Sequence, residues 1–544
     1  MYAKWENRRV ACEQRSMLER DAELQKPYSI PQRNTSQETV MNLAELLLNG
    51  RQHYGERVTV HFEERELTNF EMIRQAEQLA RVLTNAGIQP GDRVLVMMFN
   101  CPEVIQAFHA LWRIGAVAVP VTPQWLAREV RYVVEHSGAR LLLTSPMLAT
   151  KVNEAIQGLP QCQLFVFGES SVPTARNISN LIVQADPLNE TFSAKSSDPA
   201  LFIYTSGTTG QPKGVVLTHG SIHSNVESVM HVLKQNPQTM TMYVLPLSHV
   251  FGVLCMNMSA VTGAPAVILP AFEPKLVLQT IERYRVERFS AVPTMLTSLL
   301  NHPERASFDC SSLRCVDTGG AALPEELRLE FQRVFSCRVK EGYGCSEASC
   351  ALTSFGDEET YRPFSVGKAL PGIGISIQDD NDQILSPGQE GEICAQGDSI
   401  MQGYWQDSCA TQSAIRNGWL HTGDVGRTDA DGFVYITGRK KDLIIKGGEN
   451  IAPRALEDAL YEHPAVAEAA VIGLPDPLYG EDICAVVVLR AGKSATAEEL
   501  QQHVAKYVNK FKVPSTIVFH DALPKSPVGK ILKRELRRLL QPTQ

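Results

Sequence analysis

Short apolar runs alternate with amphipathic stretches over the first two thirds of the chain. Consecutive apolar positions indicate buried strands, and apolar positions three or four residues apart indicate one face of a helix. The first alternation predicts strands at residues 58–62, 93–98, 116–121 and 139–144, with helices at 75–86, from Pro102 to Gly115 and at 127–136. Strands that alternate with helices imply a parallel sheet covered on both faces.

A second alternation and then a change of pattern follow. Strands are predicted at 242–247, 266–269, 289–292 and 315–318, with a helix at 276–283. Beyond Gly367, short apolar runs at 374–378, 392–395 and 433–436 are separated by turn dipeptides, which predicts a small β-barrel or meander. The last part of the chain has its own strands at 469–472 and 483–489 and a helix that opens at Pro453.

These patterns predict an α/β protein in two parts. The large N-terminal domain, residues 41–437, is expected to contain two doubly wound βαβ halves plus the small β-barrel. A charged junction at 438–442 separates it from a small α+β C-terminal domain at 443–544. Residues 1–40 are polar and show little periodicity, and we expect them to form a leader or surface arm.

Composition narrows the class of protein. The chain has 544 residues, a formal net charge of −8 and 21% charged residues, which argues against a general nucleic-acid binder. It contains no apolar run long enough for a transmembrane helix and no apolar signal-peptide core near Met1, so we expect a cytoplasmic protein. Its twelve cysteines lack metal-ligand spacing, which favours reduced, buried thiols.

One polar stretch carries the clearest chemical signal. Residues 204–215 read Tyr-Thr-Ser-Gly-Thr-Thr-Gly-Gln-Pro-Lys-Gly-Val and lie between two apolar runs. Glycines allow close approach of the backbone, while hydroxyls, amide N–H groups and Lys213 can all donate to phosphate oxygens. A mobile polar loop would share this composition, but the lysine among donors favours a polyphosphate site. The spacing does not fit a P-loop, because Gly214 follows Lys213 where that motif has Ser or Thr.

The stretch closely resembles the phosphate-loop signature of the adenylate-forming superfamily, which comprises acyl- and aryl-CoA ligases, peptide-synthetase adenylation domains and firefly luciferase. Further motifs in the family's order extend the resemblance from about residue 40 to 540. The resemblance implies that residues 41–437 form an AMP-binding domain, that 438–442 form a hinge, and that the C-terminal domain is mobile. It also implies ATP, Mg²⁺ and coenzyme A as cofactors.

The resemblance carries individual roles onto this chain. Residues 342–347, Gly-Tyr-Gly-Cys-Ser-Glu, match a motif whose acid and the hydroxyl of Thr205 hold Mg²⁺ and whose tyrosine stacks on adenine. Segments 318–323 and 419–424 resemble the adenine-side strand end and the Thr-Gly-Asp that binds ribose. The ATP-binding residues implied are Thr205, Ser206, Gly207, Thr208, Thr209, Gly210, Lys213, Gly320, Ala321, Tyr343, Gly344, Ser346, Asp424, Arg439 and Lys530. Without the phosphate loop, Glu347 and Asp424 would each be ordinary turn residues.

Catalysis is assigned to Lys530, Lys213 and Glu347 on the same basis. A cation that bridges the α-phosphate and the departing pyrophosphate offsets the repulsion between two anions, and the position after Gly529 selects Lys530 among its lysine neighbours. Lys441 matches the hinge pivot, and Gly448 matches a glycine beside the pantetheine tunnel. The implied substrate pocket comprises His249, Phe251, Gly319 and Gly344.

Two departures from the family pattern concern the later stage and the pocket gate. In Pro453-Arg454-Ala455-Leu456-Glu457, alanine stands at the position where relatives often have the first of two glutamates, and Ser248 stands where many CoA ligases have an aromatic residue. The segment around His249 offers no acid for a substrate ammonium group, so an α-amino acid is not expected. Gly344, at a position where acetate-activating relatives have tryptophan, implies an open pocket floor.

We therefore expect ATP-dependent activation of a carboxylic acid, foremost a medium- or long-chain fatty acid, followed by transfer to coenzyme A. Three alternatives remain: an aryl-acid ligase, transfer to the phosphopantetheine thiol of an acyl-carrier protein, and an inactive nucleotide-binding scaffold. The sequence does not predict the oligomeric state, nor whether the basic C-terminal helix around Lys533 touches a membrane.

Overall fold

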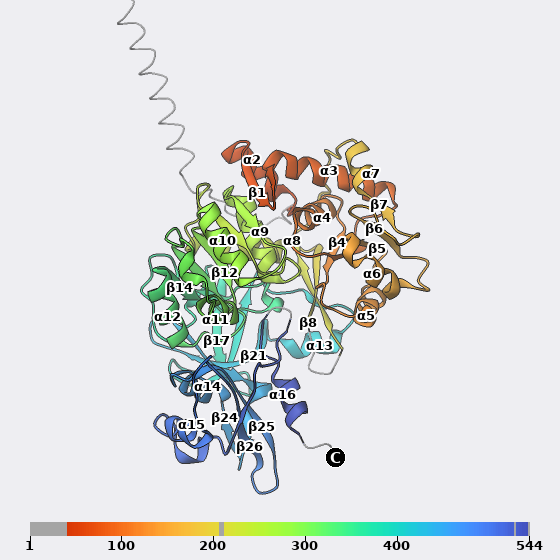
Figure 1. The fold of residues 1–544 in the computed structure, drawn as a ribbon. Coiled ribbons are helices and arrows are strands. Elements are labelled where there is room, and N and C mark those ends of the chain that lie inside the picture. The colour runs from red at the N-terminus through yellow and green to blue at the C-terminus, as the bar shows by residue number, and fades with distance from the viewer. Residues whose placement is uncertain (1–40, 206–210, 527–528, 542–544) are drawn as a thin grey trace, which may run out of the picture.

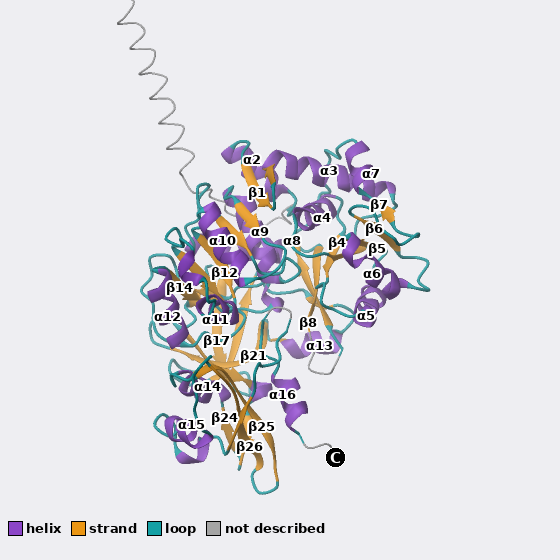
Figure 2. Ribbon diagram, in the orientation of Figure 1, coloured by secondary structure: helices purple, strands orange, loops and turns teal. Residues whose placement is uncertain are grey.

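The computed structural model describes residues 41–205, 211–526 and 529–541. Two large sheets form the N-terminal part, and Figures 1 and 2 show helices packed around both. The first sheet has the order β19-β9-β8-β4-β3-β5-β6-β7. Its strands are β3 (Arg93–Met97), β4 (Val117–Pro120), β5 (Leu141–Thr144), β6 (Gln163–Val166), β7 (Arg176–Asn177), β8 (Pro199–Thr205), β9 (Lys213–Thr218) and β19 (Gly403–Tyr404).

The second sheet has the order β14-β13-β12-β10-β11-β1-β2. Its strands are β1 (Val58–Phe62), β2 (Arg65–Thr68), β10 (Thr241–Tyr243), β11 (Ala266–Ile268), β12 (Arg288–Ala291), β13 (Cys315–Thr318) and β14 (Arg338–Glu341). Strand β1 pairs in parallel with β11, so the earliest described strand belongs to the sheet built mainly by the second alternation. The α/β class and the wound arrangement are confirmed.

Helices cover both sheets. They are α2 (Glu45–Tyr54), α3 (Asn69–Asn85), α4 (Pro102–Arg113), α5 (Ala127–Ser137), α6 (Ala149–Ile156), α7 (Ser179–Gln184), α8 (His219–Val232), α9 (Val250–Thr262), α10 (Pro274–Tyr284), α11 (Pro293–Leu300), α12 (Glu325–Phe335) and α13 (Ser408–Ala414). The prediction for α3 started six residues too late. Thr68 begins this helix, because its hydroxyl accepts from the N–H of Glu71 while Glu71 accepts from the N–H of Thr68.

The phosphate-loop stretch connects two antiparallel strands, as its flanking apolar runs predicted. Strands β8 and β9 pair with Thr205 opposite Lys213. The pairing register of β8 and β9 shifts between Pro199 and Leu201. At the intervening residue, the carbonyl of Ala200 accepts a 3.0 Å hydrogen bond from Nε1 of the fully buried Trp112. Helix α4 therefore anchors the strand that leads into the loop. Residues Ser206, Gly207, Thr208, Thr209 and Gly210 lie outside the described residues, as does the predicted leader at 1–40.

The short strands predicted beyond Gly367 form an antiparallel sheet with the order β17-β18-β21-β20, and β22 pairs with β21. These strands are β17 (Ile373–Gln378), β18 (Gly391–Gly397), β20 (Ile415–Arg416), β21 (Trp419–Thr428) and β22 (Val434–Arg439). A separate two-stranded ladder joins β15 (Thr353–Ser354) to β16 (Lys368–Ala369). The antiparallel sheet places the Thr-Gly-Asp segment on β21 next to the charged junction at the end of β22.

The C-terminal part has its own sheet, β24-β23-β26-β25, with β27 parallel to β26. Its elements are β23 (Ile444–Lys446), β24 (Glu449–Ile451), α14 (Pro453–Tyr461), β25 (Val466–Asp476), β26 (Gly480–Leu489), α15 (Ala497–Val504), β27 (Thr516–Phe519) and α16 (Lys533–Leu540). Separate clusters of buried side chains form its core, and Figure 1 shows this α+β unit, in blue, beside the larger part.

All eleven cysteines of the described ranges are free thiols. The prediction that they are mostly buried was too broad: Cys315, Cys337, Cys394 and Cys484 are buried, whereas the others are partly buried and Cys409 is exposed. No helix within those ranges is both long enough and apolar enough to cross a bilayer.

Candidate active site

A cavity of about 510 Å³ lies where the strand ends of the N-terminal part meet the C-terminal part. It is lined from both parts of the chain. Among the predicted site residues, its lining includes Thr205, Lys213, His249, Phe251, Gly319, Gly320, Tyr343, Gly344, Ser346, Glu347, Asp424, Arg439, Lys441 and Lys530. Segments that are hundreds of residues apart in sequence therefore contribute to one enclosed space.

The phosphate end of the cavity is organised around a tyrosine that the sequence did not single out. Tyr404 lies on β19, which pairs with β9. Its hydroxyl donates a 2.9 Å hydrogen bond to Oε1 of Glu347, and Nζ of Lys213 lies 4.9 Å from the centre of its ring. Tyr404 thus orients the predicted metal ligand and contacts the predicted phosphate-binding cation. No local spacing marks Tyr404, because its place beside Lys213 depends on the pairing of β19 with β9.

The donor set at this end fits Mg²⁺. The hydroxyl of Thr205 and the carboxylate of Glu347 line the same cavity, and oxygen ligands of this kind are the ones that Mg²⁺ prefers. Met401 donates its N–H to the Glu347 carbonyl at 2.7 Å, which fixes the backbone of the acidic residue. Thr205 and Glu347 would hold the ion against the phosphates.

Asp424 is held by two other predicted site residues. Its Oδ2 accepts a 2.8 Å hydrogen bond from the hydroxyl of Tyr343, and its Oδ1 lies 2.9 Å from Nε of Arg439. The Asp424 residue is 5% exposed. The carboxylate is therefore fixed in position before any ribose hydroxyl binds, which favours recognition at little entropic cost.

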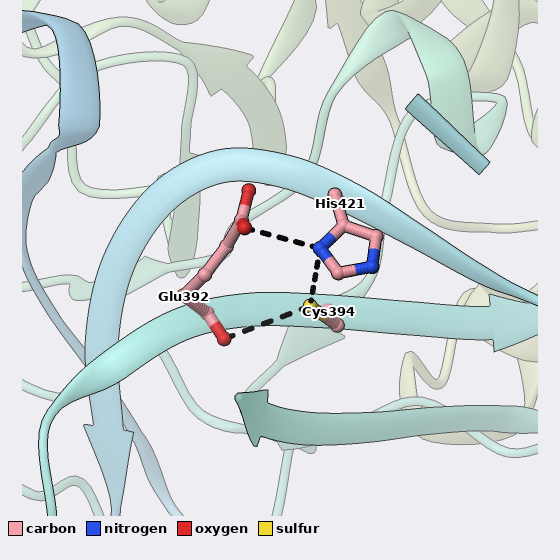
Figure 3. A group of neighbouring side chains, drawn as sticks. All are labelled: Glu392, Cys394 and His421. Atoms are coloured by element: carbon pink, nitrogen blue, oxygen red, sulfur yellow. Dashed lines mark hydrogen bonds and ion pairs between the residues drawn. The ribbon is translucent and has the colours of Figure 1, made fainter. Parts of the chain in front are cut away.

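A buried cluster supports the backbone next to Asp424 (Figure 3). Glu392, Cys394 and His421 bring a carboxylate, a thiol and an imidazole within 4.8 Å of one another. Oε1 of Glu392 accepts the N–H of Gly423 at 2.9 Å, and Oε2 lies 3.0 Å from both Nδ1 of His421 and Nζ of Lys440.

The cluster acts as an ion-pair network. Nη2 of Arg416 lies 2.9 Å from Nδ1 of His421, and Lys440 already meets the Glu392 carboxylate. Burial and the Glu392 charge raise the pKa of the Cys394 thiol to about 12, so it is a poor metal ligand. The network positions the turn before Asp424 and the residue before the predicted pivot. Sequence reasoning missed Glu392, because a single acid in a strand carries no spacing signal.

Lys530 enters the cavity from the C-terminal part. The hydroxyl of Thr294 donates to the carbonyl of Gly529 at 3.2 Å, and a Cβ built on Gly320 would lie 3.2 Å from Cε of Lys530. A turn holds the lysine backbone, since Oγ of Ser526 accepts its N–H at 3.1 Å. Burial and the nearby Arg439 charge lower the pKa of the Lys530 ammonium below its usual value.

Arg454, the residue before the missing glutamate, lies at the contact between the two parts. Its Nη2 is 3.9 Å from Oε1 of Glu341 on β14, and its Nε is 3.6 Å from Asp458. Burial raises the pKa of Glu341 to about 7, and this carboxyl also accepts the N–H of Leu323 at 3.0 Å. Arg454 thus joins α14 to the strand that leads into the Gly342–Glu347 motif.

The acyl side of the cavity begins at His249 and two glycines. His249 caps α9 by accepting the N–H of Phe251, and burial together with the Lys530 charge lowers its pKa to about 3, so it is neutral. A Cβ on Gly319 would lie 3.4 Å from the Phe251 ring. Gly344 lines the cavity, and a Cβ there would meet the Cys350 carbonyl oxygen at 1.7 Å, so the neighbouring backbone excludes any side chain at this position.

Two predicted residues lie apart from the cavity. Ala321 is not part of its lining, and neither is Gly448. Gly448 is exposed, with φ of +85° and open space around the position of a Cβ. The structure therefore brings Lys530 to the cavity and leaves the predicted pantetheine-side glycine outside it.

Comparisons with known proteins agree with this geometry. The model of the AMP-binding enzymes matches residues 49–405, and that of the AMP-binding enzyme C-terminal domain matches 455–530. A long-chain-fatty-acid–CoA ligase of Bacillus subtilis is 32% identical over 94% of this chain and 95% of its own length. A feruloyl-CoA synthase of Amycolatopsis is 34% identical over 87% and 94%.

Solved structures give the same picture. An anthranilate CoA ligase in complex with anthranoyl-AMP is similar with a TM-score of 0.86 and 25% identity, covering 92% of this chain and 98% of the other. ATP-bound MatB of Rhodopseudomonas palustris gives 0.84 and 28%, covering 92% and 99%.

We predict that Tyr404→Phe lowers the affinity for Mg²⁺ without removing nucleotide binding. The substitution keeps the ring beside Lys213 but deletes the hydrogen bond that orients Glu347, and loss of such an outer contact costs about 10-fold or more in metal affinity. Isothermal calorimetry with ATP at graded Mg²⁺ concentrations would show the midpoint shifted upward by this factor. Tyr435→Phe, outside the cavity lining, is the matched control. Identical Mg²⁺ midpoints for Tyr404→Phe and wild type would contradict the role of Tyr404.

Proposed function

This chain belongs to the AMP-binding enzyme family, and we propose that it activates a medium- or long-chain fatty acid as an acyl-adenylate and transfers the acyl group to coenzyme A. It is an AMP-forming acid–thiol ligase that uses ATP, Mg²⁺ and coenzyme A. The observation that carries the proposal is the shared cavity, in which Lys530, Lys213, Glu347 and Asp424 meet beside an apolar recess.

The first step brings two anions together. A carboxylate oxygen of the acid attacks the α-phosphorus of ATP, a new P–O bond forms, and the bond to the departing pyrophosphate breaks. Lys530 lies against Gly320, where it can meet both the attacking carboxylate and the α-phosphate, while Lys213 is paired with Thr205 on the neighbouring strand. When bound, Mg²⁺ adds charge neutralisation on the phosphate oxygens. Asp424 fixes the ribose through its two oxygens.

The second step needs a different surface of the C-terminal domain. The coenzyme A thiol attacks the acyl carbonyl carbon, the bond to the phosphate oxygen breaks, and AMP leaves with that electron pair. We propose that the domain rotates about Lys441 to withdraw Lys530 and bring Gly448 to the cavity. The exposed position of Gly448 and the presence of Lys530 in the cavity support this order of events. Lys440, tied to Glu392, would limit the rotation to the residues beyond it.

The recess favours an acid without an α-amino group. Its helix side is apolar, with Phe251, Leu254 and Met258 among its lining residues, and it holds no acid at the His249 segment. An aryl acid is the second candidate, since flat rings fit beside Gly319. A carrier-protein phosphopantetheine offers the same thiol as coenzyme A and remains a rival acceptor.

Release of AMP over a panel of fatty and aryl acids, with and without coenzyme A, tests the proposal. We expect AMP to accumulate with a fatty acid and to rise at least tenfold when coenzyme A is present, because the thiol removes the tightly held adenylate. A carrier-protein acceptor would be indicated by adenylate formation that only a phosphopantetheinylated carrier accelerates. ATP binding with no pyrophosphate exchange for any acid would instead support the scaffold alternative.

Lys530→Ala should separate the two steps. We expect adenylate formation to fall by at least 100-fold, because one preorganised charge at the transition state is worth several kcal/mol. Thioester formation from supplied acyl-adenylate should stay within about threefold of wild type, since the lysine has then left the cavity. Single-turnover assays measure the rate of each half-reaction. Lys525→Ala is the control, because Lys525 is an exposed lysine close to Lys530 in the sequence. Equal losses in both half-reactions would refute the assignment.

The alkaline limit of adenylation should report the state of Lys530. The Lys530 ammonium has a lowered pKa, so the active charged form is lost at a lower pH than for a free lysine side chain. Arg439→Gln removes a positive charge that helps to lower the Lys530 pKa. The alkaline limb should therefore move to higher pH, although ribose binding weakens. Pyrophosphate exchange measured with ATP far below saturation across the alkaline range reveals the limb of the free enzyme. A limb that stays in place or moves to lower pH would contradict this.

A further inference from the structure

The acyl recess has two chemically different walls. Apolar side chains of α8, of Leu233 directly after it and of α9 form the helix side, with Val229 and Met258 among them. The strand side, from β12, β13 and β14, includes Arg288, Ser290, Asp317 and Lys340. A recess made only for a hydrocarbon chain would gain nothing from charged groups on one wall, because burying them costs free energy.

The strand register explains why these polar residues share one wall. Ser290 lies opposite Asp317, and Asp317 lies opposite Lys340, so the three form one row across the sheet. Arg288 is two residues before Ser290 on the same face. The residues on the other face, such as Val316 and Val339, pack in the apolar core. The strands are therefore amphipathic with the polar face toward the recess.

The charged members of this wall neutralise one another. Nε and Nη2 of Arg288 lie 2.6 and 2.9 Å from the oxygens of Asp317, and Nη1 lies 3.1 Å from Asp357. Lys340 bonds Asp357 and lies 3.4 Å from Asp317. Arg288 and Lys340 are only 6% and 2% exposed. Two cations thus meet two carboxylates, and the wall offers hydrogen-bonding capacity without a net charge to be matched.

Two neutral polar groups of the recess are weakly satisfied. Among the described residues, the Ser290 hydroxyl accepts only a 3.4 Å contact from the thiol of Cys255, a weak donor. Oε1 of Gln235, in the same lining, is buried and has no hydrogen-bond partner in the part of the chain that the structure describes. An acyl group that is purely apolar would leave both groups without water or partner, whereas a hydroxyl could satisfy them.

We propose that the acid carries an uncharged hydrogen-bonding group, most simply a hydroxyl, that binds against Ser290 and Asp317. This rests on the proposed ligase function and narrows its substrate class from a plain fatty acid to a hydroxylated acyl or aryl acid. The Ser290–Asp317 row is two residues before Gly319, which belongs to the predicted substrate pocket. At about 3.3 Å per strand residue, a carboxyl group bound beside Gly319 would lie roughly 6 to 7 Å from the hydroxyl.

Matched pairs of acids test the proposal on the full-length enzyme. One pair is 4-hydroxyphenylacetate and 4-methylphenylacetate, which differ little in shape; the other is 6-hydroxydecanoate and decanoate. We expect kcat/KM for AMP formation to be at least 10-fold higher for the hydroxylated member of one pair or both, because a buried polar site rejects an analogue that leaves it unpaired. The anion 4-carboxyphenylacetate should be a poorer substrate than the hydroxy acid, since the wall is already neutral.

Variants link the preference to the wall. Ser290→Ala should lower kcat/KM for the hydroxylated acid several-fold and leave that for its apolar partner unchanged or raised. Ser298→Ala, whose hydroxyl bonds Thr294 within α11 away from the recess, is the control that should change neither. Unaltered MgATP binding by calorimetry verifies that the Ser290 variant is folded.

The outcomes separate the two proposals. AMP formation from both members of each pair at equal kcat/KM, or a preference for the apolar member, overturns the hydroxyl inference and leaves the ligase proposal standing. AMP from no acid of either pair, nor from the wider panel, overturns the ligase proposal and the inference with it. A hydroxyl preference that survives Ser290→Ala unchanged overturns the assignment to this wall.

Discussion

The antiparallel pairing of β8 with β9 is the constraint from which the site is built. It places Thr205 opposite Lys213, so the ends of the phosphate-loop segment are held together whatever the loop binds. The same strand β9 pairs with β19 on its other edge and so brings Tyr404 to Lys213 and Glu347. One short ladder therefore orders a cation, a hydroxyl and an acid that come from three distant segments.

The C-terminal part must also place Lys530 in the cavity and yet remain able to move away from it. Among the described residues, polar contacts help to hold it: Thr294 bonds the Gly529 carbonyl, Arg454 lies 3.9 Å from the buried Glu341, and Arg490 lies 3.2 Å from Glu330. Arg490 and Glu330 are partly exposed, and ion pairs of that kind contribute little each. Such an interface suits a domain that must change partners during one catalytic cycle.

Much of the fold follows from local pattern. The boundaries of β1 and β13 and the start of α4 were predicted to the residue, because each apolar run ends at a turn residue or a helix-opening proline. Predictions were poorer where a cap or a long-range pairing decides. The start of α3 depends on the Thr68–Glu71 capping box, and the strand expected at 242–247 extends only over Thr241–Tyr243.

The site was predictable to the extent that motifs are contiguous. Motif order gave Lys213, Glu347, Asp424 and Lys530, and the structure brings all four to one cavity, although their roles stay predictions. Tyr404, Glu392 and the Ser290–Asp317 wall were missed, since each acts across strand pairings that no local spacing encodes. The contact of Arg454 with Glu341 between the two parts was missed as well, because Arg454 occupies a variable position of its motif.

The pairing of β1 with β11 has a consequence for how the chain reaches this structure. Val60 pairs with Ala266, which comes 206 positions later in the chain (266 minus 60). During synthesis the β1–β2 hairpin emerges long before the sheet edge that it completes. Contacts between such distant segments are slow to form because loop closure precedes any gain. Until β11 has been synthesised, the edge of β1 that pairs with it stays unpaired. Unpaired strand edges are prone to aggregate, so chaperones can protect the nascent polypeptide during this interval.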